Sequence, residues 1–325
     1  MKTWDVVVIG GGPAGLAAAA AARKQGIEDV LILERDQMLG GILNQCIHNG
    51  FGLHTFKEEL TGPEYADRFI KVVEELKIPY HLNTMVLSIS KDKQVTYMNR
   101  EEGLVTIQAK TVVLACGASH RTLDIPGEAE LSGMGVSYCA TCDGEFFYGK
   151  EIFVIGGGFA AAEESVFLTK FASHVTILIR DDDFSCAKAV AEAAKNHPKI
   201  TVLTNTEVIC VEGDHMLRRI CYRNRNTGKE TLFDSANDTF GVFVFAGYEP
   251  NTSLVKELVN LDPHGYVITD KSRQTSCQGI YAAGDVCQKN LRQVVTAVGD
   301  GATAATELEK YAAAMQGRTG IHAKQ

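Results

Sequence analysis

The sequence lacks any uninterrupted run of 18 apolar residues, so no membrane-spanning helix is expected. It also lacks a long run of charges of one sign, and 45% hydrophobic residues is too many for a disordered chain. Its 7 prolines and 31 glycines follow no fixed period, which excludes collagen and low-complexity chains. Basic residues number 32 against 40 acidic ones, and the net charge of −8 makes nucleic acid or an anionic membrane a poor partner.

Cysteine is sparse, since 9 residues in 325 are too few for a disulfide scaffold and their number is odd. Only Cys139 and Cys142 lie close together, as Cys-Ala-Thr-Cys. No second C-x-x-C and no histidine pair at ligand spacing accompanies them, which favours a redox dithiol over half of a zinc site. A reducing compartment, the cytoplasm, is therefore expected. Asp143 is a candidate acid for the leaving thiolate, and a turn with Gly144 is its structural alternative.

Alternating strand and helix patterns predict an α/β chain of about two domains. Residues 5–9, a glycine turn, and residues 16–25 and 29–33 form a strand–turn–helix–strand unit. The same order returns over residues 151–179, and its glycine turn begins 146 positions after the first. Two dinucleotide-type folds are therefore expected rather than a short-period repeat. A helix over 70–78, separate strands over 104–110 and 111–115, and a closing helix over 293–314 are also expected.

The first glycine turn fits the pattern G-x-G-x-x-G of dinucleotide-binding units. It comprises Gly10, Gly11, Gly12, Pro13, Ala14 and Gly15. Gly10 permits a tight turn, Gly12 lets backbone N–H groups approach a pyrophosphate, and Gly15 lets the helix pack closely on the strand. Glu34 ends the second strand, where a carboxylate accepts hydrogen bonds from a ribose. These features together predict a bound dinucleotide.

The second glycine turn fits G-x-G-x-x-A, but its ligand stays open. Phe159 puts a bulky ring into the loop, and three aspartates at 181–183 follow the next strand. With Arg180 as the one cation beside them, these carboxylates would repel a ribose 2′-phosphate, so NADPH is disfavoured. NADH with an aspartate on its ribose, and an empty or blocked site, are the two alternatives. A second nucleotide site would comprise Gly156, Gly158, Ala161 and Arg180.

Several segments resemble the low-molecular-weight thioredoxin reductases, from residue 5 to about residue 310. The redox-active segment of that family is similar to CATCDGEFF, and its domain crossover is similar to ACGA and IPG. Its C-terminal flavin segments are similar to IYAAGD and RQVVTAVGDG. The resemblance implies two Rossmann-like dinucleotide-binding domains, the second inserted in the first. Residues 1–118 and 249–325 would bind FAD, and residues 119–248 would form an NAD(P)H-type domain that carries the dithiol.

The resemblance also implies the roles of individual residues. Asp285 would contact the ribityl chain of FAD, and residues 292–293 would lie near the flavin. Cys142 would take electrons beside the flavin ring. Cys139 would attack the disulfide of thioredoxin or a thioredoxin-like protein, and Asp143 would be the acid. A homodimer whose domains rotate against each other is implied as well. The residues expected to bind FAD are Gly10, Gly12, Pro13, Ala14, Gly15, Glu34, Arg35, Gly41, Ala115, Gly117, Gly284, Asp285, Arg292, Gln293 and Val294.

Two departures from the family pattern concern the electron donor and residues 40–65. Where the family has His-Arg-Arg and a further arginine for the 2′-phosphate, this chain has Ile-Arg-Asp at 179–181 and then Ser185. This resembles the pyridine-nucleotide-independent branch, so reduced ferredoxin is the favoured donor and NADH the second. Residues 40–65 resemble flavoproteins of anaerobic glycerol-3-phosphate oxidation. For Cys46 and two histidines there, packing and surface roles are favoured over a metal or extra redox site, so no metal is expected.

Other interpretations stay open. The chain would alternatively be an NADH oxidase or peroxiredoxin-reductase component, or a flavin redox sensor whose second nucleotide site has degenerated. A basic cluster would be either a docking face for an acidic ferredoxin or thioredoxin, or a solvated hairpin face, and the second is favoured. This cluster consists of Arg218, Arg219, Arg223, Arg225 and Lys229.

Overall fold

The computed structural model describes residues 2–46, 49–52, 56–236 and 238–315. The chain divides into two compact units, one built from residues 1–119 and 249–325 and the other from residues 120–248. The sequence analysis set the borders after residues 118 and 248. Each unit contains a parallel sheet with helices, which confirms the predicted α/β fold of two Rossmann-like units. None of the helices in the described ranges is long and apolar enough to cross a membrane.

The first unit is built on a seven-stranded sheet in the order β5-β2-β1-β8-β7-β6, with β19 also paired to β8. Its strands are β1 (Thr3–Ile9), β2 (Val30–Leu33), β5 (Tyr80–His81), β6 (Met85–Ile89), β7 (Gln94–Asn99), β8 (Gly103–Leu114) and β19 (Ile280–Ala282). Strands β5, β2, β1, β8 and β19 are joined in parallel, whereas β6, β7 and β8 form an antiparallel meander. A small antiparallel pair, β3 (Asn49–Phe51) and β4 (Leu60–Thr61), stands apart from this sheet.

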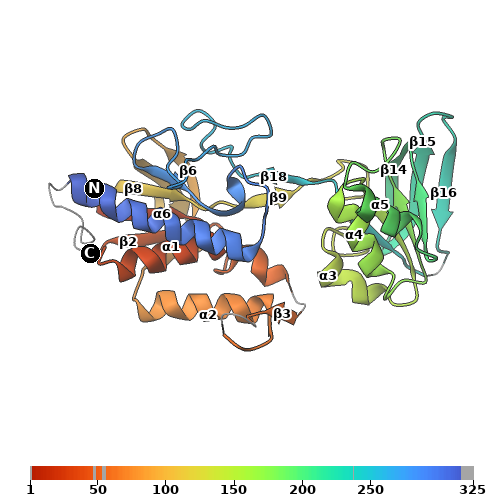
Figure 1. Ribbon diagram of the computed structural model, residues 1–325, viewed down its shortest axis with the longest axis horizontal. Helices are drawn as coiled ribbons and strands as arrows, with labels where there is room; N and C mark the ends of the chain where they lie inside the picture. Colours follow the sequence, from red (N-terminus) through yellow and green to blue (C-terminus); the bar gives the residue numbers. More distant parts are fainter. Residues whose placement is uncertain (1, 47–48, 53–55, 237, 316–325) are drawn as a thin grey trace. The chain divides into compact units, whose positions relative to one another are not determined.

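Both faces of β1, within the parallel part of this sheet, are buried, as an uninterrupted run of β-branched residues predicts for a parallel strand. Along β1, Val6 and Val8 belong to the core with α1 (Pro13–Lys24) and α6 (Val294–Met315). Val7 belongs to the core on the opposite face, because successive side chains of a strand alternate. Helices α1 and α6 lie side by side (Figure 1). The short helices η1 (Gly41–Gln45) and η3 (Gly284–Val286) follow β2 and β19 along the chain.

Two sequence expectations in this unit were wrong in detail. Helix α2 (Gly62–Glu75) begins eight residues before the expected start, because Thr61 caps it. The Thr61 hydroxyl accepts from the Glu64 N–H, and the Glu64 carboxylate accepts from the Thr61 N–H, which forms a capping box. The expected strands at 104–110 and 111–115 are one strand, β8, whose first half pairs with β7 and whose second half pairs with β1 and β19.

The second unit has a five-stranded parallel sheet in the order β10-β17-β11-β12-β13 and a separate antiparallel sheet, β14-β15-β16. The parallel strands are β10 (Val136–Ser137), β11 (Glu151–Ile155), β12 (His174–Leu178), β13 (Ile200–Leu203) and β17 (Gly241–Val244). The antiparallel strands are β14 (Thr206–Gly213), β15 (Leu217–Asn224) and β16 (Glu230–Asp234). The helices are α3 (Ala140–Asp143), η2 (Gly144–Phe147), α4 (Phe159–Leu168) and α5 (Lys188–Lys195).

The helices and the antiparallel sheet of this unit cover opposite faces of its parallel sheet. Ile152 and Val154 of β11 share a core with α4, whereas Phe153 shares a core with Val211 and Ile220 of the antiparallel sheet. The rings of Phe153 and Tyr222 lie 6.0 Å apart between centroids. Strands β9 (Ala118–His120) and β18 (Tyr248–Pro250), where the chain passes between the units, pair with one another.

The contact between α1 and α6 requires glycine at one position. A Cβ atom on Gly301 would lie 2.2 Å from the Ala14 carbonyl oxygen, so α6 would have to move away from α1. We expect Gly301→Ala to lower the free energy of unfolding of the first unit by about 1–3 kcal/mol. Urea unfolding followed by Trp4 fluorescence measures this, because Trp4 is the only tryptophan and is buried in β1.

Gly299→Ala is the matched control in the same helix. A Cβ atom there would meet nothing within 4 Å, so the change should be neutral or stabilise the helix by up to about 1 kcal/mol. Equal unfolding midpoints for the Gly301→Ala protein and the unmodified protein would contradict the steric explanation.

Candidate functional site

The first glycine turn joins β1 to α1 and excludes side chains where the backbone comes close to itself. Gly10 has a φ of +105°, and a Cβ atom on it would lie 2.3 Å from the Ala115 carbonyl oxygen. A Cβ atom on Gly15 would lie 1.9 Å from the Gly10 carbonyl oxygen. Gly12 is extended, Pro13 is the first residue of α1, and no side chain caps this helix. The free N–H groups of the first helical turn therefore face the region where an anion would bind.

Glu34 supports this turn from the end of β2. Its buried carboxylate accepts the Gly11 N–H through Oε2 at 2.5 Å and the Asp36 N–H through Oε1 at 2.9 Å. The sequence predicts a ribose as the ligand of this carboxylate, and in the structure the carboxylate also holds the backbone of the glycine turn. A carboxylate has about four acceptor sites, so two hydrogen bonds leave capacity for a hydroxyl ligand.

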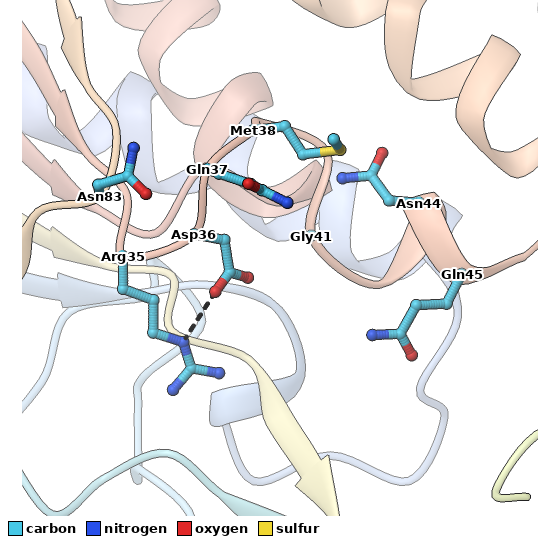
Figure 2. A pocket seen from close by; sticks show the side chains of 8 residues that line it. All are labelled: Arg35, Asp36, Gln37, Met38, Gly41, Asn44, Gln45 and Asn83. Carbon is cyan, nitrogen blue, oxygen red and sulfur yellow. Dashed lines mark ion pairs between the residues drawn. The ribbon is translucent and has the colours of Figure 1, made fainter. Parts of the chain in front are cut away.

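A cavity of about 450 Å³ lies next to Glu34 along the chain (Figure 2). Most of its lining residues are polar, and they come from the loop after β2, from η1 and from the loop after β5. Arg35 and Gly41 were predicted as site residues, and Arg35 pairs with Asp36 at 3.8 Å. The other lining residues were not predicted, because nothing in their types or spacing marks them. The cavity is lined by Arg35, Asp36, Gln37, Met38, Gly41, Asn44, Gln45 and Asn83.

Asp285 lies in η3, directly after β19. Its Oδ1 is buried without a hydrogen-bond partner among the described residues, and the Lys289 ammonium is 3.9 Å away. Burial raises the pKa of Asp285 above its usual range, and the Asp300 charge adds to this, while Lys289 and Arg292 oppose it. A buried carboxylate oxygen of this kind is suited to a ligand hydroxyl that donates a hydrogen bond.

Asp300 of α6 holds η3 in place and was not predicted as a site residue. Its buried carboxylate accepts the Gly284 N–H at 3.1 Å and the Lys289 ammonium at 2.6 Å, and it pairs with Arg273 at 2.7 Å. The signal for it lay within the segment RQVVTAVGDG, but that resemblance carried no role for this residue. Three partners on one buried carboxylate make this the most densely paired charge of the site.

The remaining predicted residues of the first unit lie at the ends of strands and at the start of α6. Ala115 and Gly117 follow β8, and the Gly117 carbonyl oxygen accepts the Asn251 N–H at 3.1 Å. The Arg292 guanidinium lies 3.9 Å from the centroid of the Tyr266 ring, and Gln293 precedes Val294, the first residue of α6. Strands β1, β2, β8 and β19 are parallel, so these segments gather at their common carboxyl edge, where α/β sheets bind ligands.

The cysteine motif lies in the second unit, at β10 and α3. Cys139 is disulfide-bonded, and its N–H donates to the Ser137 hydroxyl at 3.1 Å. The same hydroxyl donates to Asp143 Oδ2 at 2.6 Å, so it links the candidate acid to the cysteine backbone. Ser137 was not predicted, because a serine two positions before the motif gives no signal in the sequence. The backbone of Cys142 lies in α3, and its side chain is outside the part of the chain that the structure describes.

The second glycine turn has the backbone of the first but different side chains around it. Gly10 donates its N–H to Leu33 at 2.9 Å, and Gly156 donates to Leu178 at 3.1 Å, so these positions correspond. The residue after Leu33 is Glu34, whereas the residue after Leu178 is Ile179. An apolar side chain thus stands where the first unit has its carboxylate.

The other side chains near the second turn also differ from those of the first turn. Ile179 is fully buried, and a Cβ atom on Gly157 would lie 2.8 Å from its Cγ2. Phe159, 52% exposed, occupies the first position of α4, as Pro13 does in α1. Arg180, expected in a second nucleotide site, lies one residue beyond Ile179, and its carbonyl oxygen accepts from Arg225 at 3.1 Å. Gly158 precedes α4 as its N-cap residue with extended backbone, and Ala161 is buried within the helix.

Cys46 and two arginines of the basic cluster, which the sequence singled out, have partners within the fold. The Cys46 thiol donates to the Ile42 carbonyl oxygen at 3.4 Å, while His48 and His54 lie outside the described residues. Within the described residues, no cluster of three metal-ligating side chains occurs. In the basic cluster, Arg219 pairs with Glu212 at 2.9 Å and Arg223 pairs with Glu207 at 2.7 Å. These pairs favour a solvated hairpin face over a docking site for an acidic protein.

Comparison with known proteins agrees with this geometry. The family model described as pyridine nucleotide-disulphide oxidoreductase matches residues 4–301. A thioredoxin reductase of Peptoclostridium litorale is 41% identical over 95% of this chain and 97% of its own. The crystal structure of Lactococcus lactis thioredoxin reductase (FR conformation) is 35% identical, covers 96% of this chain and 99% of its own, and has a TM-score of 0.77. That of T. acidophilum is 33% identical over 95% and 98%, with a TM-score of 0.74.

The two hydrogen bonds of Glu34 can be tested by substitution. We expect Glu34→Ala to lower the free energy of unfolding of the first unit by about 2–4 kcal/mol, because two buried N–H groups lose their acceptor. Glu34→Gln retains one acceptor oxygen and should lose about half as much. Urea unfolding followed by Trp4 fluorescence distinguishes the two variants, and an unchanged midpoint for Glu34→Ala would refute the supporting role.

Proposed function

The chain belongs to the pyridine nucleotide-disulphide oxidoreductases and, within them, to the low-molecular-weight thioredoxin reductases, and we propose that it reduces the disulfide of thioredoxin or a thioredoxin-like protein through Cys139 and Cys142. It is an FAD-type disulfide oxidoreductase. The observation that carries the cysteine assignment is the Ser137 hydroxyl, which connects the Cys139 backbone to the Asp143 carboxylate. The homodimer implied by the resemblance and the cytoplasmic location inferred from the cysteine content stay predictions.

Three features of the first unit support FAD as its ligand. The uncapped start of α1 suits a pyrophosphate, and the polar cavity of about 450 Å³ beyond Glu34 has the size of a nucleotide subsite. The buried Asp285 Oδ1, without a hydrogen-bond partner among the described residues, suits a ribityl hydroxyl. The flavin, when bound, would supply the electron pair that reduces the Cys139–Cys142 disulfide. We therefore assign residues up to 118 and from 249 to FAD binding.

The cysteine pair would carry out thiol–disulfide exchange with the partner. The Cys139 thiolate attacks one sulfur of the partner disulfide, forms a mixed disulfide and expels the other sulfur. Cys142 then attacks the Cys139 sulfur, which closes the cysteine disulfide and releases the partner as a dithiol. The partner gains two electrons and two protons, and the cysteine pair loses them. Asp143 would protonate the leaving thiolate, with its carboxylate held by the Ser137 hydroxyl at 2.6 Å.

For the electron donor, we propose reduced ferredoxin rather than a nicotinamide nucleotide. The buried Ile179 at the position that corresponds to Glu34 offers no acceptor for a ribose hydroxyl and no cation for a 2′-phosphate. The carboxylates of Asp181 and Asp182 would repel that phosphate, whereas Asp183 is paired with Lys195 at 2.5 Å. Phe159 is 52% exposed at the start of α4. NADH is the second candidate, because the backbone turn itself is retained.

The cysteine assignment is tested by substitution. We expect Cys139→Ser to lower the rate of thioredoxin reduction at least about 100-fold while the bound flavin stays unchanged, because the attacking thiolate is lost. Reduced methyl viologen as the electron source makes the assay independent of the physiological donor. Cys277→Ser, which changes a half-buried free thiol of the first unit, is the control and should keep the normal rate. A normal rate for Cys139→Ser would refute the assigned path.

The donor is tested by anaerobic stopped-flow mixing of the flavin-loaded protein with NADPH, NADH and reduced ferredoxin in separate experiments. We expect rapid loss of flavin absorbance with reduced ferredoxin alone, because only a protein donor needs no ribose site in the second unit. Rapid loss with NADPH would overturn the inference from Ile179 and the aspartates. Rapid loss with NADH and not with ferredoxin would identify the second candidate as the donor.

A further inference from the structure

Two cysteines outside the C-x-x-C motif face each other across the antiparallel sheet of the second unit. Cys210 of β14 and Cys221 of β15 are directly paired in the strand register. Both are free thiols, and both are half-buried. They lie eleven positions apart in the sequence, so only the hairpin between β14 and β15 brings them together.

The two thiols are near neighbours because their residues are directly opposed in the strand register. The Cys210 side chain accordingly contributes to the raised pKa of Cys221, after burial as the larger cause. Directly opposed residues of antiparallel strands have Cβ atoms about 4.5–5.5 Å apart, and a disulfide needs about 3.5–4.5 Å. The two backbones must therefore approach by roughly an ångström. A register irregularity between Val208 and Cys210 gives β14 local freedom for this movement.

Ion pairs on either side keep the two cysteines in register. Toward one end of the hairpin, Arg219 pairs with Glu212 at 2.9 Å and with Asp234 at 3.0 Å. Toward the other end, Arg223 pairs with Glu207 at 2.7 Å and with Glu230 at 3.8 Å. Each arginine thus spans all three strands, β14, β15 and β16, two positions along β15 from Cys221. A slip of the hairpin by one residue would break both sets of pairs and separate the thiols.

We propose that Cys210 and Cys221 form a second oxidisable dithiol, which small disulfides convert to a cross-strand disulfide. One thiolate attacks the small disulfide, forms a mixed disulfide and releases one thiol. The other cysteine attacks the sulfur that remains on the protein, which releases the second thiol and forms the Cys210–Cys221 bond. The small disulfide gains two electrons and two protons, and the two cysteines lose them.

The environment of the two thiols determines the rate of this reaction. Burial raises the pKa of Cys221, and the negative charges of Glu230 and Glu212 add to the effect, so little thiolate exists at neutral pH. The charged groups around the pair include Arg219, Arg223 and Arg225, and each of these arginines is paired with at least one carboxylate of Glu207, Glu212, Glu230 or Asp234. Oxidation should therefore quicken as the pH rises. At neutral pH the Cys210–Cys221 disulfide should therefore form slowly.

Peptide mapping of the full-length, flavin-loaded protein tests the proposal. The protein is incubated at pH 8.5 with glutathione disulfide, its remaining thiols are blocked with N-ethylmaleimide, and it is digested with trypsin without reduction. Trypsin cuts after Lys199, Arg218, Arg219 and Arg223, so the two cysteines fall on separate peptides, 200–218 and 220–223. We expect mass spectrometry to detect these peptides joined by a disulfide, and to detect them apart after treatment with dithiothreitol.

Matched variants separate a closed pair from two independent thiols. In Cys210→Ser the joined peptides should be absent and Cys221 should carry glutathione, and Cys221→Ser should give the mirror result. The proposal is overturned if the unmodified protein yields both cysteines blocked by maleimide, since the pair then resists oxidation. It is equally overturned if the unmodified protein carries glutathione on each cysteine without joined peptides, since the second attack then fails.

Discussion

Close approach between backbone segments at the first glycine turn is the constraint on which the site depends. β1 and β8 are parallel neighbours, and beyond their ends the turn passes so near Ala115 that no side chain fits at Gly10. No side chain fits at Gly15 either, so the first turn of α1 can lie close to the Gly10 carbonyl oxygen. Gly301 lets α6 lie against α1. Asp285 and Arg292 come from segments that follow β19 and precede α6. Their positions are therefore fixed by backbone contacts before any ligand contributes.

Two buried carboxylates stabilise this arrangement through hydrogen bonds and ion pairs. Glu34 holds the turn from the side of β2, and Asp300 holds η3 from the side of α6. Both are buried carboxylates whose partners are backbone N–H groups or cations, which compensates the cost of burying charge. The site thus has two rigid supports, one at each end of the region assigned to FAD, while Asp285 keeps an oxygen without a hydrogen-bond partner among the described residues.

The sequence predicted the fold class and the positions of the strands well, because buried parallel strands are continuous apolar runs between glycine turns. The strands expected at residues 5–9 and 29–33 correspond to β1 (Thr3–Ile9) and β2 (Val30–Leu33). The start of α2 was not predicted, because the helix begins at a capping box and not at a periodic pattern of apolar residues. Ser137 and the polar lining of the cavity could not be predicted, because their importance comes from contacts between segments and not from residue type. The roles assigned to Cys139, Cys142 and Asp143 stay predictions.

The second glycine turn shows that a glycine pattern alone does not identify a ligand. A Cβ atom on Gly156 would lie 2.5 Å from the Phe245 carbonyl oxygen, so the parallel sheet alone requires glycine there. Selection for a stable sheet would preserve this residue even in a lineage that no longer handles a nucleotide at the turn. The glycine pattern in the second unit is therefore explained by the backbone geometry of the sheet, whether or not a nucleotide binds there. The side chain that follows the next strand, Glu34 in the first unit and Ile179 in the second, is what distinguishes the two turns.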